Sequence, residues 1–276
     1  SPAADGADRA AWRRGAVTDG GVLAELAELG PFFALESHLA ASAPLAGWRP
    51  LEELFEQPSA LEARVAVVRA ALAEASGQQP ADVELRVAAS MTQLGLAAGL
   101  ICPALGVAVL TGRLLEVDPA RMRWQPGPGG AVALSISDEA LPPASSPASA
   151  SSTASASSTA LSVELADGLA RAVLAGPVAA LVEASTPFAV SPKVLWGNVA
   201  SVVNGAGALI GAAAPLLIGP AEALVSRLLN QPPLLGTHQG SPSDRFRRRS
   251  CCLVYRLAPA QAPVCGDCVL DRAPER

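Results

Sequence analysis

Four of the five cysteines lie in one segment near the end of the sequence, RRRSCCLVYRLAPAQAPVCGDCVL. Cys251 and Cys252 are adjacent, and Cys265 and Cys268 form a Cys-x-x-Cys motif. Four thiolates can hold a zinc ion or an iron–sulfur cluster. Neighbouring side chains in extended backbone point to opposite faces, so placing both on one ion requires a bent chain. The spacing therefore favours an iron–sulfur cluster over zinc, and a vicinal disulfide is disfavoured because it is strained.

The other residues that commonly do chemistry are sparse. Cys102 lies in an apolar stretch, where a lone cysteine usually acts as a small hydrophobic side chain. The two histidines, His38 and His238, have no partner at metal-ligand spacing. His238 lies in a polar stretch shortly before the cysteines and is a candidate contact of the site. A nucleophile elbow is absent from the sequence, so acyl-transfer catalysis has no local support.

The cysteine pattern, with Tyr255 and a proline-bearing stretch between the two motifs, resembles the C-terminal signature of FhuF-type ferric-siderophore reductases. Two further stretches are similar to that family: LWGN at 195–198, and VAASMTQLGLAAGLICPALGVAVLTG followed by DPARMRW. The resemblance implies that a 2Fe-2S cluster is bound by Cys251, Cys252, Cys265 and Cys268. The Ser/Ala-rich insert at 142–159 and the long loop between the motifs depart from the family pattern.

The chemistry that the resemblance implies needs few side chains. Siderophores bind ferric iron through hard anionic oxygens and hold ferrous iron far more weakly. One electron is therefore enough to release the metal, and a 2Fe-2S cluster is a one-electron carrier. The expected activity is ferric-siderophore reduction, with a hydroxamate-type chelate as substrate and a ferredoxin or flavin-dependent reductase as electron donor. The alternative is a non-enzymatic siderophore- or metal-binding protein with a structural cluster or a zinc site.

Candidate contacts for the substrate or the electron donor follow from charge and position. A basic run directly precedes the cysteines and would favour the more negative, reduced form of a cluster. We also include the single lysine, the tryptophan of LWGN and the histidine near the motif. The candidates are Lys193, Trp196, His238, Arg247, Arg248 and Arg249.

Composition limits the class of protein and the compartment. The chain has 276 residues, a net charge of −5 and only 16% charged residues, so nucleic-acid binding is not expected. The sequence starts without a secretory signal pattern, which predicts a cytoplasmic protein with reduced thiols. Two uncharged stretches, 87–112 and 194–221, are long enough to span a bilayer. Alanine, glycine and polar residues lower the hydrophobicity of both stretches, so we expect helices buried in a soluble protein. A peripheral contact with a membrane is compatible with this expectation.

The expected architecture is α+β, predominantly helical, with a small β-hairpin and a C-terminal iron–sulfur lobe. A helical lobe at 1–141, a disordered linker or inserted loop at 142–160 and a helical lobe at 161–276 are predicted. Periodicity and capping predict helices at 22–29, 51–55, 60–75 (capped by Ser59), 81–102, 103–111, 161–174, 177–184, 221–230 and one starting at Pro192. Strands are predicted at 122–125 and 131–136, as a hairpin, and at 253–257.

Overall fold

The computed structural model describes residues 20–40, 46–127, 130–141, 154–242, 244–257 and 264–274. Within these ranges the chain is mainly helical and carries two small sheets, which confirms the predicted α+β class. The helices are α2 (Gly20–Glu28), α3 (Glu53–Glu56), α4 (Pro58–Ser76), α5 (Leu85–Thr111), α6 (Ala154–Leu169), α7 (Ala179–Ser185), α8 (Pro192–Ala213) and α9 (Ile218–Leu229). A π-helical segment, Ala170–Val178, joins α6 to α7.

Helix α5 is the central element of the fold. Most side chains from Val87 to Ala108 are buried, and α5 contacts the helices α2, α4, α7 and α8. The sequence predicts a break before Pro103, and this prediction is wrong, because α5 continues through the proline to Thr111. Proline removes one helical hydrogen bond. Burial of the apolar side chains on both sides of it stabilises the continuous helix instead.

Helix α4 ends as expected but begins differently. Gly77 terminates it with a left-handed φ of 66°, which glycine adopts without strain. The predicted Ser59 cap is wrong: the helix starts at Pro58, and Gln57 occupies the cap position without a side-chain hydrogen bond. Proline is favoured at the first helical position because its missing N–H has no partner there anyway.

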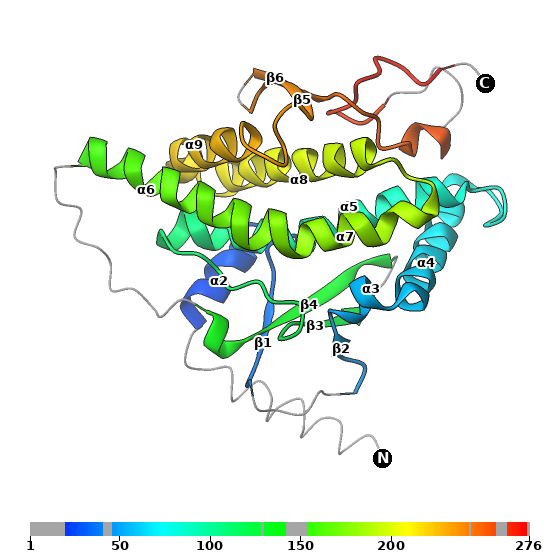
Figure 1. Ribbon diagram of the computed structural model, residues 1–276, viewed down its shortest axis with the longest axis horizontal. Helices are drawn as coiled ribbons and strands as arrows, with labels where there is room; N and C mark the ends of the chain where they lie inside the picture. The colour runs from blue at the N-terminus through cyan, green and yellow to red at the C-terminus, as the bar shows by residue number, and fades with distance from the viewer. Residues whose placement is uncertain are drawn as a thin grey trace.

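The predicted hairpin is confirmed as β3 (Arg123–Pro126) and β4 (Val132–Ser137). The short strands β1 (Glu36–His38) and β2 (Arg49–Pro50) complete a sheet of order β1-β4-β3-β2, in which β1 runs parallel to β4. The sheet lies on one side of the helices in Figure 1, and β4 contacts α5. The β3–β4 pair buries Trp124, which is among the largest fully buried side chains.

The segment predicted as a linker lies mostly outside the described residues, which resume at 154. Helix α6 already begins at Ala154, within the predicted linker. Side chains from both predicted lobes form one hydrophobic cluster that includes Leu26, Leu105, Leu195 and Phe246. The boundaries of the two predicted lobes, 1–141 and 161–276, therefore stay a prediction.

Among the described residues, three helical stretches are long and apolar enough to cross a membrane by length and composition: 85–111, 162–188 and 192–213. Between 50% and 67% of each apolar window is buried inside the protein. The expectation that these helices are part of a soluble core stays a prediction.

The cysteine segment lies on the opposite side of the helices from the β1–β4 sheet (Figure 1). Strands β5 (His238–Ser241) and β6 (Asp244–Arg248) form an antiparallel pair, and β6 contacts α8. The predicted strand at 253–257 is wrong, because Val254–Leu257 is a 3-10 helix, η6. The short 3-10 helices η2 (Asp138–Ala140), η4 (Thr186–Phe188) and η5 (Pro215–Leu217) complete the described elements.

Candidate metal centre

The four clustered cysteines form two sulfur pairs in the structure. The Sγ atoms of Cys252 and Cys265 lie 3.7 Å apart, and those of Cys251 and Cys268 also lie 3.7 Å apart. Each pair takes one cysteine from each motif. With metal–sulfur bonds of about 2.3 Å and tetrahedral geometry, two thiolates on one ion lie about 3.8 Å apart. The two pairs therefore have the spacing expected for two metal ions with two thiolates each.

Four thiolates on a single zinc ion have the same spacing within each pair, so the two distances alone are compatible with both kinds of site. In the described part of the chain, no three His, Cys, Asp or Glu side chains are arranged to hold a single ion. The donor set and its pairing thus fit a 2Fe-2S cluster, in which each iron takes two thiolates.

The backbone bends where the adjacent cysteines require it. Leu253 has a left-handed φ of 71°, so the chain turns directly after Cys252. This turn explains why the predicted strand does not form. The backbone N–H of Leu253 donates to the Cys251 sulfur at 3.3 Å, and that of Leu270 donates to the Cys268 sulfur at 3.4 Å. Such N–H donors stabilise negative charge on sulfur.

Exposure differs within each sulfur pair. Cys252 and Cys268 are 2% exposed, whereas Cys251 and Cys265 are half-buried. Each pair therefore has one sulfur in the interior and one nearer the surface. A redox centre held in this way is shielded from water on one side and open to an approaching partner on the other.

Hydrogen bonds among the cysteines and the charge of one arginine shift the pKa values of the thiols in this site. The pKa of Cys252 is lowered by hydrogen bonds from Cys251 and Cys265 and by the charge of Arg248. The pKa values of Cys251 and Cys265 are raised, first because each donates to the Cys252 sulfur and second by burial. Cys102 lies apart in α5, and burial raises its pKa to about 12, so it is a neutral thiol. This agrees with its predicted role as a packing residue.

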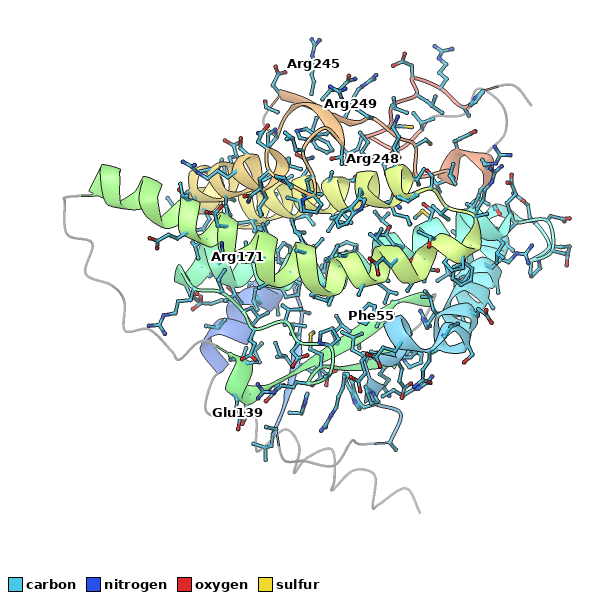
Figure 2. All side chains as sticks on the ribbon, viewed as in Figure 1. Phe55, Glu139, Arg171, Arg245, Arg248 and Arg249 are labelled. Carbon is cyan, nitrogen blue, oxygen red and sulfur yellow. The ribbon has the colours of Figure 1, made fainter. Side chains whose placement is uncertain are left out.

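The three arginines of the basic run have different surroundings. Arg248 is 2% exposed, and one of its terminal nitrogens donates to the Cys265 sulfur at 2.7 Å. Arg247 pairs with Asp271 at 2.8 Å, and Arg249 donates to the backbone oxygen of His238 at 2.9 Å. Figure 2 shows Arg248 and Arg249 on the face that carries β5 and β6. The structure thus brings Arg248 alone of the three into direct contact with a cysteine.

The other candidate contacts lie around the site rather than in it. Lys193 is exposed at the start of α8, and its backbone oxygen accepts a hydrogen bond from Ser250 at 2.9 Å. Trp196 is half-buried against the core. The His238 ring stacks on Phe246 at 5.4 Å, and burial and then Arg249 lower its pKa. Contact of these residues with a substrate or donor stays a prediction.

Three buried polar residues behind the cysteines were not among the predicted site residues. Ser90 and Gln93 of α5 and Asn198 of α8 are 0% exposed. The Ser90 hydroxyl donates to the backbone oxygen of Cys252 at 2.9 Å, and the Asn198 oxygen accepts from Arg248 at 3.0 Å. Their signal is visible in the sequence: each is a polar residue in an otherwise apolar helix, and buried polar groups need partners.

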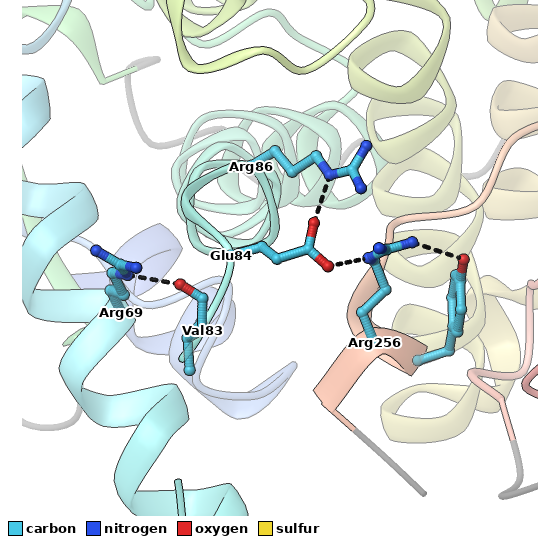
Figure 3. Close-up of polar contacts among 6 residues, drawn as sticks. Arg69, Val83, Glu84, Arg86 and Arg256 are labelled. Atoms are coloured by element: carbon cyan, nitrogen blue, oxygen red, sulfur yellow. Dashed lines mark hydrogen bonds and ion pairs between the residues drawn. The ribbon is translucent and has the colours of Figure 1, made fainter. Parts of the chain in front are cut away.

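A second set of contacts connects the cysteine segment to the start of α5. Arg256 of η6 pairs with Glu84, and Glu84 also pairs with Arg86 at 2.7 Å (Figure 3). Gln78 donates to the backbone oxygen of Leu257 at 3.1 Å. These groups are partly exposed, so each pair contributes about 0–1 kcal/mol. They fix the position of η6 more than they stabilise the fold.

An apolar groove opens beside the cysteines. It has a volume of about 430 Å³ and lies between α5 and α8, with Leu94, Ala98 and Gly205 in its walls. Asp267, which lies between Cys265 and Cys268 in sequence, reaches the groove. Its carboxylate accepts a hydrogen bond from Ser201, another groove residue. The groove therefore shares a residue with the loop that carries two of the sulfurs.

Comparison with known proteins agrees with this geometry. Residues 248–270 match the family described as the FhuF 2Fe-2S C-terminal domain. The matched segment begins at Arg248 and contains all four clustered cysteines. A search of the curated proteins finds no match to the chain. The predicted resemblance is therefore confirmed over the cysteine segment: residues 248–270 are similar to the 2Fe-2S domain of the FhuF family, and a 2Fe-2S cluster is the cofactor that these four cysteines support.

Proposed function

We propose that this protein is a ferric-siderophore reductase that releases ferrous iron by one-electron reduction of the bound metal. The observation that carries the proposal is the set of two sulfur pairs, each with one half-buried sulfur, within a segment that matches the FhuF 2Fe-2S domain. A bound 2Fe-2S cluster supplies one electron at a time. The four cysteines would hold that group, with Cys251 and Cys265 half-buried and so nearer the surface than Cys252 and Cys268.

The groove beside Asp267 is the proposed binding place for the chelate. Its walls are mainly apolar, and Asp267 is the acidic residue that reaches it. Three hydroxamates neutralise ferric iron, whereas three catecholates leave a strongly negative complex. An apolar groove with a carboxylate at its edge disfavours a negative ligand, because burying a charge without a partner is costly. These features support a hydroxamate-type chelate as the substrate.

The electron must come from a separate protein in this proposal. We propose a ferredoxin or a flavin-dependent reductase as donor, since the sequence carries no convincing nicotinamide or flavin motif. The half-buried Arg247 and the exposed Arg249, both near the sulfurs, would attract an acidic donor surface. We further propose a cytoplasmic location, where the thiols stay reduced for cluster assembly.

The test is a single-turnover reaction with the cluster-loaded protein. The protein is reduced chemically under anaerobic conditions and mixed with ferric hydroxamate or ferric catecholate chelates. Visible absorption of the protein and a ferrous-specific dye follow the two products. We expect one ferrous ion per reduced cluster, with faster reaction for hydroxamates. A reduced protein that is not reoxidised by any chelate would instead support the binding protein with a structural cluster.

The groove is tested by filling it. A Cβ on Gly205 meets no atom within 4 Å, so Gly205→Leu extends into the groove without strain in the helix. We expect a raised KM for the chelate and an unchanged iron content. The matched control is Gly21→Leu in α2, where a Cβ also has open space. Equal kinetics in the two variants would place the chelate elsewhere.

A further inference from the structure

A chain of buried polar side chains connects two helices to the cysteine segment. Gln93 lies on α5, Asn198 on α8 and Arg248 at the end of β6, and none of the three is more than 2% exposed. They meet although Arg248 is 50 residues from Asn198, and Asn198 is 105 residues from Gln93. Buried polar groups in an apolar core are costly unless they are hydrogen-bonded. The hydrogen bonds among these three side chains therefore decide whether the chain is stable in the core.

The hydrogen bonds of this chain fix the direction of each amide. The Gln93 amide nitrogen donates to the backbone oxygen of Leu195 at 3.5 Å, which leaves its oxygen free to accept. The Asn198 amide nitrogen donates to that oxygen at 3.1 Å and to the Ser90 hydroxyl oxygen at 3.0 Å. The Asn198 oxygen therefore faces the opposite way, toward Arg248, and accepts from it at 3.0 Å. A flipped Asn198 would place an N–H donor against the guanidinium.

The far side of Arg248 faces the sulfurs. One terminal nitrogen is held by Asn198, and the other donates to the Cys265 sulfur at 2.7 Å. The Arg248 backbone N–H donates to the backbone oxygen of Asp267 at 2.9 Å, within the Cys-x-x-Cys turn. The planar guanidinium cannot rotate without losing one of these bonds. Arg248 is thus a fixed positive charge in direct contact with one ligand sulfur.

We propose that Gln93 and Asn198 position Arg248 so that its fixed N–H···S bond sets the reduction potential of the cluster. The cluster becomes one unit more negative when it takes an electron. A buried positive charge on a ligand sulfur stabilises the reduced form more than the oxidised form, and hydrogen bonds to sulfur raise the potential in the same direction. Because Arg248 is buried, salt screens its effect only weakly. Arg247 is half-buried and Arg249 is exposed, and their guanidinium groups bond elsewhere.

The experiment is a dye-mediated redox titration of the cluster-loaded full chain. The variants are Arg248→Gln, which removes the charge, and Asn198→Asp, which keeps a hydrogen-bond acceptor for Arg248 but adds a compensating negative charge. We expect each to lower the reduced-to-oxidised ratio about tenfold at a fixed ambient potential, equivalent to about 59 mV for one electron. The shift should be the same at low and high salt. The matched controls, Arg247→Gln and Arg249→Gln, should show an unchanged potential at high salt.

Gln93→Leu tests the positioning step, because this side chain contacts no cysteine among the described contacts. We expect a smaller shift in the same direction with full iron content. A loaded Asn198→Asp or Arg248→Gln protein with an unchanged potential would overturn the proposal. If Gln93→Leu loses the cluster, Gln93 holds the cluster in place and its proposed effect on the potential is overturned, while Arg248→Gln and Asn198→Asp still test the charge. The measurement needs no siderophore, so its failure is distinct from failure of the proposed reductase activity.

Discussion

At the residue scale, the main result is that the four cysteines are not equivalent. Cys252 and Cys268 are buried, and each faces a half-buried cysteine of the other motif. The spacing of the cysteines in the sequence does not predict that Cys252 pairs with Cys265 and Cys251 with Cys268. A cluster held in this way has two thiolates that are shielded and two that a partner can approach.

The ligand set is tested by single Cys→Ser variants of Cys251, Cys252, Cys265 and Cys268. We expect each to lose most of the iron and the visible absorption, because a serine hydroxyl is a poorer ligand than a thiolate. Cys102→Ser is the control and should keep the full iron content, although it costs some stability by placing a hydroxyl in an apolar site. A clustered-cysteine variant with full iron and unchanged spectrum would remove that residue from the ligand set.

At the scale of elements, α8 and the cysteine segment approach each other closely at one glycine. A Cβ on Gly197 would lie 2.1 Å from the Ser250 hydroxyl oxygen. Ser250 directly precedes Cys251, and its hydroxyl donates to the backbone oxygen of Lys193. The absence of a side chain at Gly197 therefore allows the residue before the first cysteine to pack on the helix.

This contact predicts a loss and a rescue. Gly197→Ala should displace Ser250 and lower the iron content, although alanine favours the helix by about 1 kcal/mol. Adding Ser250→Ala removes the clashing oxygen and leaves its Cβ at an ordinary 3.5 Å. We expect the double variant to recover iron content toward that of Ser250→Ala alone, measured as iron per chain. Equal loss in the single and double variants would contradict the close contact as the cause.

At the scale of the whole molecule, one hydrophobic core holds the β1–β4 sheet on one side of the helices and the cysteine segment on the other (Figure 1). The sheet contains a buried histidine, His38, whose ring nitrogen lies 2.8 Å from the Ser135 hydroxyl oxygen. Burial and then Arg123 lower its pKa, opposed by a backbone hydrogen bond to Arg121 and by Asp138. This group couples the stability of the sheet to pH.

The sign of that coupling follows from proton binding. The folded chain binds a proton at His38 less readily than the unfolded chain, whose pKa is near 6.5. The unfolded state therefore gains protons first as pH falls through 6.5, and the folded state loses stability. We expect urea midpoints to fall from pH 7.5 to pH 5.5, less steeply in His38→Asn than in the unchanged protein. Identical slopes would assign the pH dependence to other groups.

The sequence by itself determined the candidate ligands and the local preference of each segment for helix or strand. The four clustered cysteines, the helical class and the β3–β4 hairpin were predictable, because spacing and periodicity are properties of neighbouring residues. The sequence also contains a pattern that indicates which arginines of the basic run are buried and which are exposed. Within β6, Phe246 and Arg248 are buried while Arg245 is exposed and Arg247 is half-buried, which is the alternation of a half-buried strand. Recognising it required knowing that a strand, β6, runs from Asp244 to Arg248.

Tertiary structure alone decided which distant groups meet. The continuation of α5 through Pro103, the crossed sulfur pairing and the contact of Asn198 with Arg248 depend on packing between segments far apart in sequence. Local propensity favours a break at a proline and an extended backbone at Leu253–Leu257. Burial of α5 and the turn after Cys252 outweigh these preferences, because side-chain packing and hydrogen bonds across the fold contribute more than single-residue propensities of about 1 kcal/mol.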